Sequence, residues 1–157
     1  MATKSIIIAV DNSKECFKAV DFVLEHFPKG YEYHLLHVQV SSIASELITD
    51  DDDVGLKHER PYKMDKELTA ASEDFLKEYF LPKAQANGAE VTSTLLHSFP
   101  DGSTSIGSAI CEFAEKTRPA ALVLMKQQKS ALKRFFLGSV TKFCVVHSHV
   151  PVIVVPA

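Results

Sequence analysis

The sequence predicts an α/β fold in which one open parallel sheet of five strands carries helices on both faces. Apolar segments of strand length alternate with segments of helical periodicity along most of the chain. This alternation is typical of parallel sheets whose strands are joined by crossover helices. The first apolar run, residues 6–10, also has no polar residue at alternate positions. That pattern indicates a strand buried on both of its faces.

The first forty residues form a strand, a helix and a second strand. We expect the first strand over residues 5–10 and the second over 33–40. Between them, apolar residues recur at spacings of three and four behind Ser13, a good helix N-cap, and the pattern ends at Pro28. This is the size of one parallel βαβ unit.

Residues 41–64 break the alternation. They contain the acidic run Asp50 to Asp53, a lone Gly55 and Pro61, with no sustained period. Segments of this length without regular structure are uncommon inside compact domains and are usually functional or mobile. We therefore expect a long, variable acidic loop on the surface.

The second half of the chain returns to regular alternation. The periodicity predicts a helix over 65–80, which Pro82 should kink or interrupt because proline lacks the amide proton. The remaining predictions are strands over 90–96 and 121–125, a helix around 106–113, a helix over 139–147, and a last strand from Val150 to Val155.

Length and composition limit the class of protein. The 157 residues fit a single domain over 1–157, and a net charge of −3 gives no overall attraction to nucleic acid or an anionic membrane. No apolar run approaches the roughly 18 residues of a membrane span. The N-terminus runs directly into a strand, and the three cysteines include no C-x-x-C pair. We expect a cytoplasmic protein with structural thiols.

Common catalytic and metal motifs fail at specific positions. Gly102 and Gly107 have P-loop spacing, but the Lys-Ser/Thr that should follow is replaced by Ser108 and Ala109. His147 and His149 lack further ligands nearby, and the odd spacing of His34 and His37 puts them on opposite faces of a strand. We expect neither a catalytic site nor a metal site.

Two segments could bind a ligand at the carboxyl ends of the strands, where open α/β sheets place their sites. Asp11 follows the first strand and could face a ribose or base, or it could simply help to cap the helix. Gly138 and Ser139 begin a helix and could hold a phosphate, or they could be a plain N-cap.

Four segments together carry a family resemblance: Ala-Val-Asp-Asn-Ser (9–13), Leu-Leu-His-Val (35–38), Leu-Lys-Arg-Phe-Phe-Leu-Gly-Ser-Val-Thr (132–141) and His-Val-Pro-Val-Ile-Val-Val (149–155). In this order and spacing the sequence resembles the universal stress protein family over essentially its whole length. The resemblance implies a flavodoxin-like, Rossmann-like parallel sheet of order 3-2-1-4-5 and a homodimer. It also implies AMP binding, or ATP binding with Mg²⁺, through the motif Gly-x2-Gly-x9-Gly-Ser/Thr.

The sequence departs from that motif at both phosphate-loop glycines. When Gly138 and Ser139 are aligned with its last two positions, Met125 and Gln128 stand where the first two glycines belong. A side chain there hinders the close approach of backbone amides to phosphates. Asp11 and Val38 match the family's nucleoside contacts, and positive charge remains nearby. The candidate nucleotide-binding residues are therefore Asp11, Val38, Met125, Gln128, Gly138, Ser139 and Val140.

Three functions remain open. The first is a non-enzymatic stress-response or adaptor domain that acts through protein partners, with at most weak adenine-nucleotide binding. The second is an ATP or AMP sensor with slow ATPase activity, and the third is an architectural subunit of a larger assembly. The last strand, Val150 to Val155, is apolar at nearly every position. Such an edge needs cover, so we expect a second copy of the chain, or another protein, on it.

Overall fold

The computed structural model describes residues 3–41, 59–98, 103–126 and 137–157. Its five strands form one sheet of order β3-β2-β1-β4-β5, and every neighbouring pair is parallel. This confirms the predicted flavodoxin-like sheet. The strands are β1 (Lys4–Ala9), β2 (Tyr31–Val40), β3 (Val91–Ser98), β4 (Ala121–Met125) and β5 (Val152–Val155). Observed and expected ends of the first four strands differ by at most two residues.

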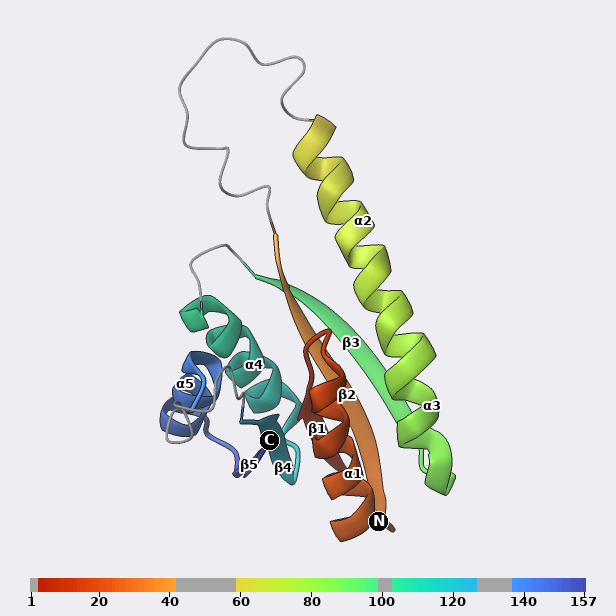
Figure 1. Ribbon diagram of the computed structural model, residues 1–157. Coiled ribbons are helices and arrows are strands. Elements are labelled where there is room, and N and C mark those ends of the chain that lie inside the picture. Colours follow the sequence, from red (N-terminus) through yellow and green to blue (C-terminus); the bar gives the residue numbers. More distant parts are fainter. Residues whose placement is uncertain (1–2, 42–58, 99–102, 127–136) are drawn as a thin grey trace.

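Helices connect the strands and cover both faces of the sheet (Figure 1). A 3₁₀ turn, η1 (Lys14–Cys16), leads into α1 (Phe17–His26), and the described part of the second connection, from Glu59, is also helical. Its parts are α2 (Glu59–Phe75), a π-helical turn η3 (Leu76–Phe80), α3 (Leu81–Ala84) and a 3₁₀ turn η4 (Gln85–Asn87). The last two helices are α4 (Ser103–Thr117) and α5 (Ser139–His147).

Two apolar cores lie on opposite faces of the sheet. On β1, Ile6 and Ile8 face the core under α1, η3 and α3, whereas Ile7 faces the core under α4 and α5. All three isoleucines are at most 1% exposed. The uninterrupted apolar run of the first strand therefore serves two helical layers at once, because successive side chains point to opposite faces.

The expected loop over 41–64 is too long at its C-terminal end, because α2 begins at Glu59. Pro61, which was expected inside this loop, falls in the first turn of the helix. Proline is tolerated there, since the first turn of a helix has no intrahelical partner for its amide groups. The acidic run Asp50 to Asp53 lies outside the described residues.

The prediction that Pro82 would interrupt its helix is confirmed. The α-helical pattern gives way to the π turn Leu76–Phe80, and Pro82 stands in the first turn of the short helix that follows. The missing amide proton of proline removes one hydrogen bond to the preceding turn. The irregularity therefore begins one turn before the proline itself.

The last strand is shorter than expected and less buried. It begins at Val152 instead of Val150, after the imide nitrogen of Pro151, which has no proton to donate. The periodicity and apolar runs also predict that Ile7, Ala9, Leu36, Val123 and Val152 lie in the interior. The first four are buried, but Val152 is only partly buried. The reason is that β5 pairs with β4 alone and forms an edge of the sheet. No helix in the described part of the chain is long and apolar enough to cross a membrane.

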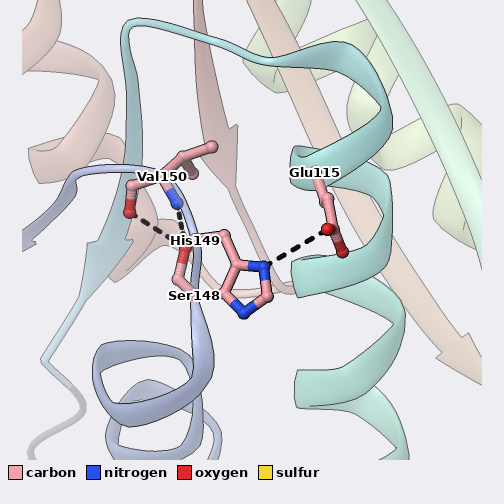
Figure 2. Close-up of polar contacts among 4 residues, drawn as sticks. All are labelled: Glu115, Ser148, His149 and Val150. Carbon is pink, nitrogen blue, oxygen red and sulfur yellow. Dashed lines mark hydrogen bonds and ion pairs between the residues drawn. The ribbon is translucent and has the colours of Figure 1, made fainter.

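The helices α4 and α5 pack closely against each other. A Cβ built on Gly107 of α4 would lie 2.5 Å from Cδ1 of Phe143 on α5, so only glycine fits this contact. At the far end of α5, Nδ1 of His149 lies 3.2 Å from Oε1 of Glu115 on α4, as Figure 2 shows. Both groups are exposed, so this pair adds little stability. The glycine contact sets the separation of the two helices.

Gly107→Ala should therefore destabilise the protein, by about 1–3 kcal/mol, through overpacking. In an unobstructed helix the same change stabilises by roughly 0.5–1 kcal/mol. Urea unfolding of Gly107→Ala, Phe143→Ala and the double variant separates the two effects. Alanine at 107 should become neutral or stabilising once the phenyl ring is removed. Equal stabilisation by alanine in both backgrounds would contradict the contact.

Candidate functional site

A pocket opens at the carboxyl ends of β1 and β4, where the strand order reverses. The chain leaves β1 toward one face of the sheet, where Cys16 and α1 join the first core. The helix that follows β4, α5, lies on the opposite face with Cys144 in the second core. The two departures leave a crevice between them, as in other open α/β sheets.

The cavity has a volume of about 180 Å³. Its walls are mostly apolar, with a few polar groups at one side, which is the usual character of a small-molecule site. The volume is below the roughly 300–1,000 Å³ that holds a drug-sized ligand. It is lined by Ala9, Val10, Asp11, Cys16, Leu36, His37, Val38, Ile106, Ile110, Leu124, Met125, Gly138, Ser139, Val140 and Thr141.

Six of the seven residues expected from the sequence meet at this cavity. They come from three separate segments: the end of β1, the second half of β2, and the region that joins β4 to α5. The six are Asp11, Val38, Met125, Gly138, Ser139 and Val140. The seventh, Gln128, lies outside the described residues.

Asp11 shapes the loop that follows β1. One carboxylate oxygen, Oδ1, accepts a hydrogen bond from the backbone N–H of Ser13 at 2.9 Å and another from the thiol of Cys16 at 3.2 Å. Ser13, the N-cap residue, makes no side-chain cap, so its predicted capping bond is not formed, and Asp11 holds the turn before the helix instead. Burial raises the pKa of the Cys16 thiol to about 12, so it remains a protonated donor to Asp11.

His37 holds the end of β1 against β2. Its Nδ1 donates to the carbonyl oxygen of Val10 at 2.9 Å, and the backbone N–H of Val10 donates to the carbonyl of Leu36 at 2.8 Å. These bonds extend the β1–β2 contact one residue past the strand. The side chain is 7% exposed and lines the pocket.

His34 lies on the other face of β2, as its spacing from His37 predicted. Its ring packs 5.1 Å from the ring of Phe113 on α4, and its two nitrogens contact the hydroxyls of Thr92 and Thr94. Partial burial lowers the pKa of His34. It is therefore a neutral packing residue near pH 7 and does not reach the pocket lining.

The N-terminus of α5 forms the polar side of the pocket. The first-turn amides of Ser139 and Val140 have no intrahelical acceptor, as in any helix. The N-cap residue, Gly138, has no side chain that could accept from them. The hydroxyl of Thr141 donates to the carbonyl of Met125 at 3.2 Å and fixes the start of the helix against the end of β4. Such a helix end favours an anion.

Met125 is a core residue as well as a pocket residue. It is 7% exposed, and its side chain packs into the core under α1 together with Val123. A glycine at this position would leave an empty volume in that core. The methionine that replaces the first motif glycine therefore has a structural role in this chain.

The described residues contain no group of three or more His, Cys, Asp or Glu side chains that could hold a metal ion. His147 donates from Nδ1 to the carbonyl of Phe143 and stacks on that ring, while His149 pairs with Glu115. The two histidines of the His-Ser-His segment therefore have separate structural partners.

A family model described as the universal stress protein family matches residues 2–156. The chain belongs to the universal stress protein family. A comparison with curated protein sequences found no significant match.

Solved structures of similar fold cover nearly the whole chain. The hypothetical protein MJ0577 aligns with a TM-score of 0.70 at 23% identity, over 100% of this chain and 98% of the other. A universal stress protein in complex with cAMP aligns with a TM-score of 0.65 at 17% identity, over 99% and 98%. The universal stress protein from Archaeoglobus fulgidus in complex with dAMP aligns with a TM-score of 0.56 at 18% identity, over 98% of each chain. At these identities the likeness shows the fold.

Three polar pocket residues of this universal stress domain were not among the candidates from the sequence: Cys16, His37 and Thr141. Cys16 was interpreted only as part of an apolar helix face, and His37 only as an unpaired strand histidine. Register could have indicated His37, because Ala9 pairs with Leu36 and places the next residues side by side. The bond from Thr141 to Met125 joins two segments whose separation the sequence does not encode.

Proposed function

We propose that this universal stress protein is a non-enzymatic, cytoplasmic stress-response or adaptor domain. Its pocket binds the nucleoside part of an adenine nucleotide weakly, and its effect passes through protein partners. The observation that carries the proposal is the convergence on one cavity, at the strand-order reversal, of six residues that the family resemblance marked as nucleotide contacts. Complexes of similar folds with cAMP and dAMP support an adenine ligand.

The pocket chemistry suits a nucleoside better than a triphosphate. Apolar side chains from β2 and α4, among them Val38 and Ile106, offer flat contact to a base. The carboxylate of Asp11 can accept hydrogen bonds from ribose hydroxyls. The amides of Ser139 and Val140 can receive one phosphate group. Beyond that point the motif calls for backbone free of side chains, and Met125 supplies a buried side chain instead.

The described pocket residues also support binding without catalysis. A nucleophile or general base needs an accessible, suitably poised group. Burial raises the pKa of the Cys16 thiol to about 12, and this thiol donates a hydrogen bond to Asp11. Nδ1 of His37 already donates a hydrogen bond to the carbonyl of Val10. We therefore expect no phosphate release from ATP above the rate of the buffer control.

Adenosine, AMP and ATP should bind with affinities within about tenfold of one another, because the triphosphate finds few partners beyond the first phosphate. Isothermal titration calorimetry measures this directly. A thermal melt offers a second readout, since a ligand at 100 times its Kd stabilises by about 2.7 kcal/mol. Submicromolar ATP affinity together with much weaker adenosine binding would contradict the proposal.

A matched pair of variants tests whether the ligand binds in the pocket. Val140→Tyr fills the cavity beside the N-terminus of α5 and should reduce adenosine affinity at least tenfold. Val146→Tyr makes the same change on the same helix at a site that is 67% exposed, and it should bind like the wild type. Equal affinities for the two variants would locate binding elsewhere.

The absence of the two phosphate-loop glycines of the family motif can be tested separately. Met125→Gly with Gln128→Gly should strengthen ATP binding several-fold relative to adenosine, since backbone amides gain access to the phosphates. Met125 is buried, so this double variant loses about 2–5 kcal/mol of stability and must be shown to be folded. Gln128→Gly alone keeps the core intact. An unchanged ratio of ATP to adenosine affinity in both variants would refute the role assigned to the glycines.

We also propose that a second copy of the chain covers the outer edge of β5. Among the described strands β5 has a neighbour on one side only, and Val152, Ile153 and Val154 remain partly exposed. Val145 and Val146, on the helix that packs against β5, are 49% and 67% exposed. An apolar edge of this kind favours pairing with another strand. A two-fold axis would close the assembly.

Ile153→Lys should shift the protein from dimer to monomer in sedimentation velocity at tens of micromolar. Ile153 also packs against the core under α1, so a thermal melt must show that the variant remains folded. Leu68→Lys, an equivalent change at an exposed site on α2, should leave the dimer intact. A wild type that sediments at its monomer mass of 17.4 kDa would reject the homodimer and favour a different protein at this edge.

A further inference from the structure

Cys111 and Cys144 are far apart in the sequence but neighbours in the fold. Cys111 lies on α4 and Cys144 on α5, and these two helices pack side by side in Figure 1. Cys144 belongs to the core under α4 and α5, Cys111 packs against the same core, and each thiol influences the pKa of the other. Neither cysteine forms a disulfide in the structure.

The close approach of the helices brings both cysteines to the same core. Gly107 has no side chain to separate α4 from Phe143, the residue before Cys144. The Sγ atom of Cys144 lies 3.8 Å from the carbonyl oxygen of Gly107, to which its thiol donates. Cys111 follows Gly107 by four residues and therefore lies on the same side of α4, one turn along.

The two thiols differ in their access to solvent. Cys144 is fully buried, with no exposed surface, whereas Cys111 is partly exposed. A small oxidant can therefore reach Cys111 first, with Cys144 in place behind it. The third cysteine, Cys16, lies in the other core, where its thiol donates to Asp11.

We propose that Cys111 and Cys144 are a modification site that forms an intramolecular disulfide when the protein is exposed to a peroxide. The thiolate of Cys111 attacks one peroxide oxygen, the O–O bond breaks and hydroxide leaves, which gives a sulfenic acid. The sulfur of Cys144 then attacks the sulfenic sulfur. Its proton goes to the departing oxygen, and water leaves as the S–S bond forms. The two sulfurs lose two electrons in total, and the peroxide gains them.

The reaction is slow, because the thiolate is the reactive form. Burial raises the pKa of Cys111, and it raises the pKa of Cys144 to about 12. The pair therefore responds to sustained oxidation and not to brief pulses. The bond would join two helices that both line the pocket, but its formation does not depend on nucleotide binding.

Peptide mapping of the whole protein tests the proposal. After treatment with millimolar hydrogen peroxide, alkylation and trypsin digestion without reductant, residues 84–116 and 143–157 should appear as one cross-linked species, lighter by two hydrogens than the sum of the two peptides. A reductant should separate them. The peptide with Cys16, residues 15–18, should carry the alkyl group in treated and untreated samples alike.

Variants supply an independent readout. Cross-linking should raise the Tm of the wild type by about 5–10 °C, since the bond restricts the unfolded chain. Cys16→Ser should show the same gain, and the partly exposed Cys111→Ser should show none. Cys111 converted to sulfinic acid while Cys144 remains alkylatable, or a cross-link that joins two chains instead of one, would overturn the proposal.

Discussion

The reversal of strand order between β1 and β4 is the constraint on which the rest of the structure depends. These two strands are paired and parallel, yet the chain leaves them toward opposite faces of the sheet. The connections after β1 and β4 run to opposite faces, so neither covers the space between the ends of these two strands. A crevice remains at their carboxyl ends. The buried, two-faced character of β1 follows from the same topology, since both helical layers need its isoleucines. Fold and pocket are thus two results of one arrangement.

Hydrogen bonds at the strand ends keep this crevice in shape. Oδ1 of Asp11 ties the turn after β1, His37 fixes the carbonyl of Val10, and the Thr141 hydroxyl secures the start of α5 to the end of β4. Each of these side chains lines the cavity as well. The groups that build the site are thus the groups that a ligand meets. Met125 also has two roles, because it lines the cavity and its side chain fills part of the core under α1. A phosphate-binding loop would need glycine at this position.

The sequence was sufficient to predict the alternation of elements and the parallel sheet, and its family resemblance gave six of the fifteen residues that line the pocket. Periodicity records which faces are buried, and polar residues that follow apolar strands mark the carboxyl edge. It failed where a residue's role depends on a distant neighbour. Cys16 was assigned to an apolar helix face, but its thiol also donates to Asp11. Pro61 was assigned to a loop, but it lies in the first turn of α2. Cys111 and Cys144 looked unrelated because nothing in the sequence sets the separation of α4 and α5.

The central claim is that the cavity at the strand-order reversal holds a nucleoside. Amide chemical shifts recorded by NMR during an adenosine titration test it most directly. The signals of Asp11, Val38 and Ser139, which come from three segments of the chain, should move together with one saturable dependence on ligand concentration. Signals of exposed residues on α2, such as Leu68, should remain in place. Saturable shifts confined to residues outside the cavity, or no shifts at millimolar adenosine, would contradict the account.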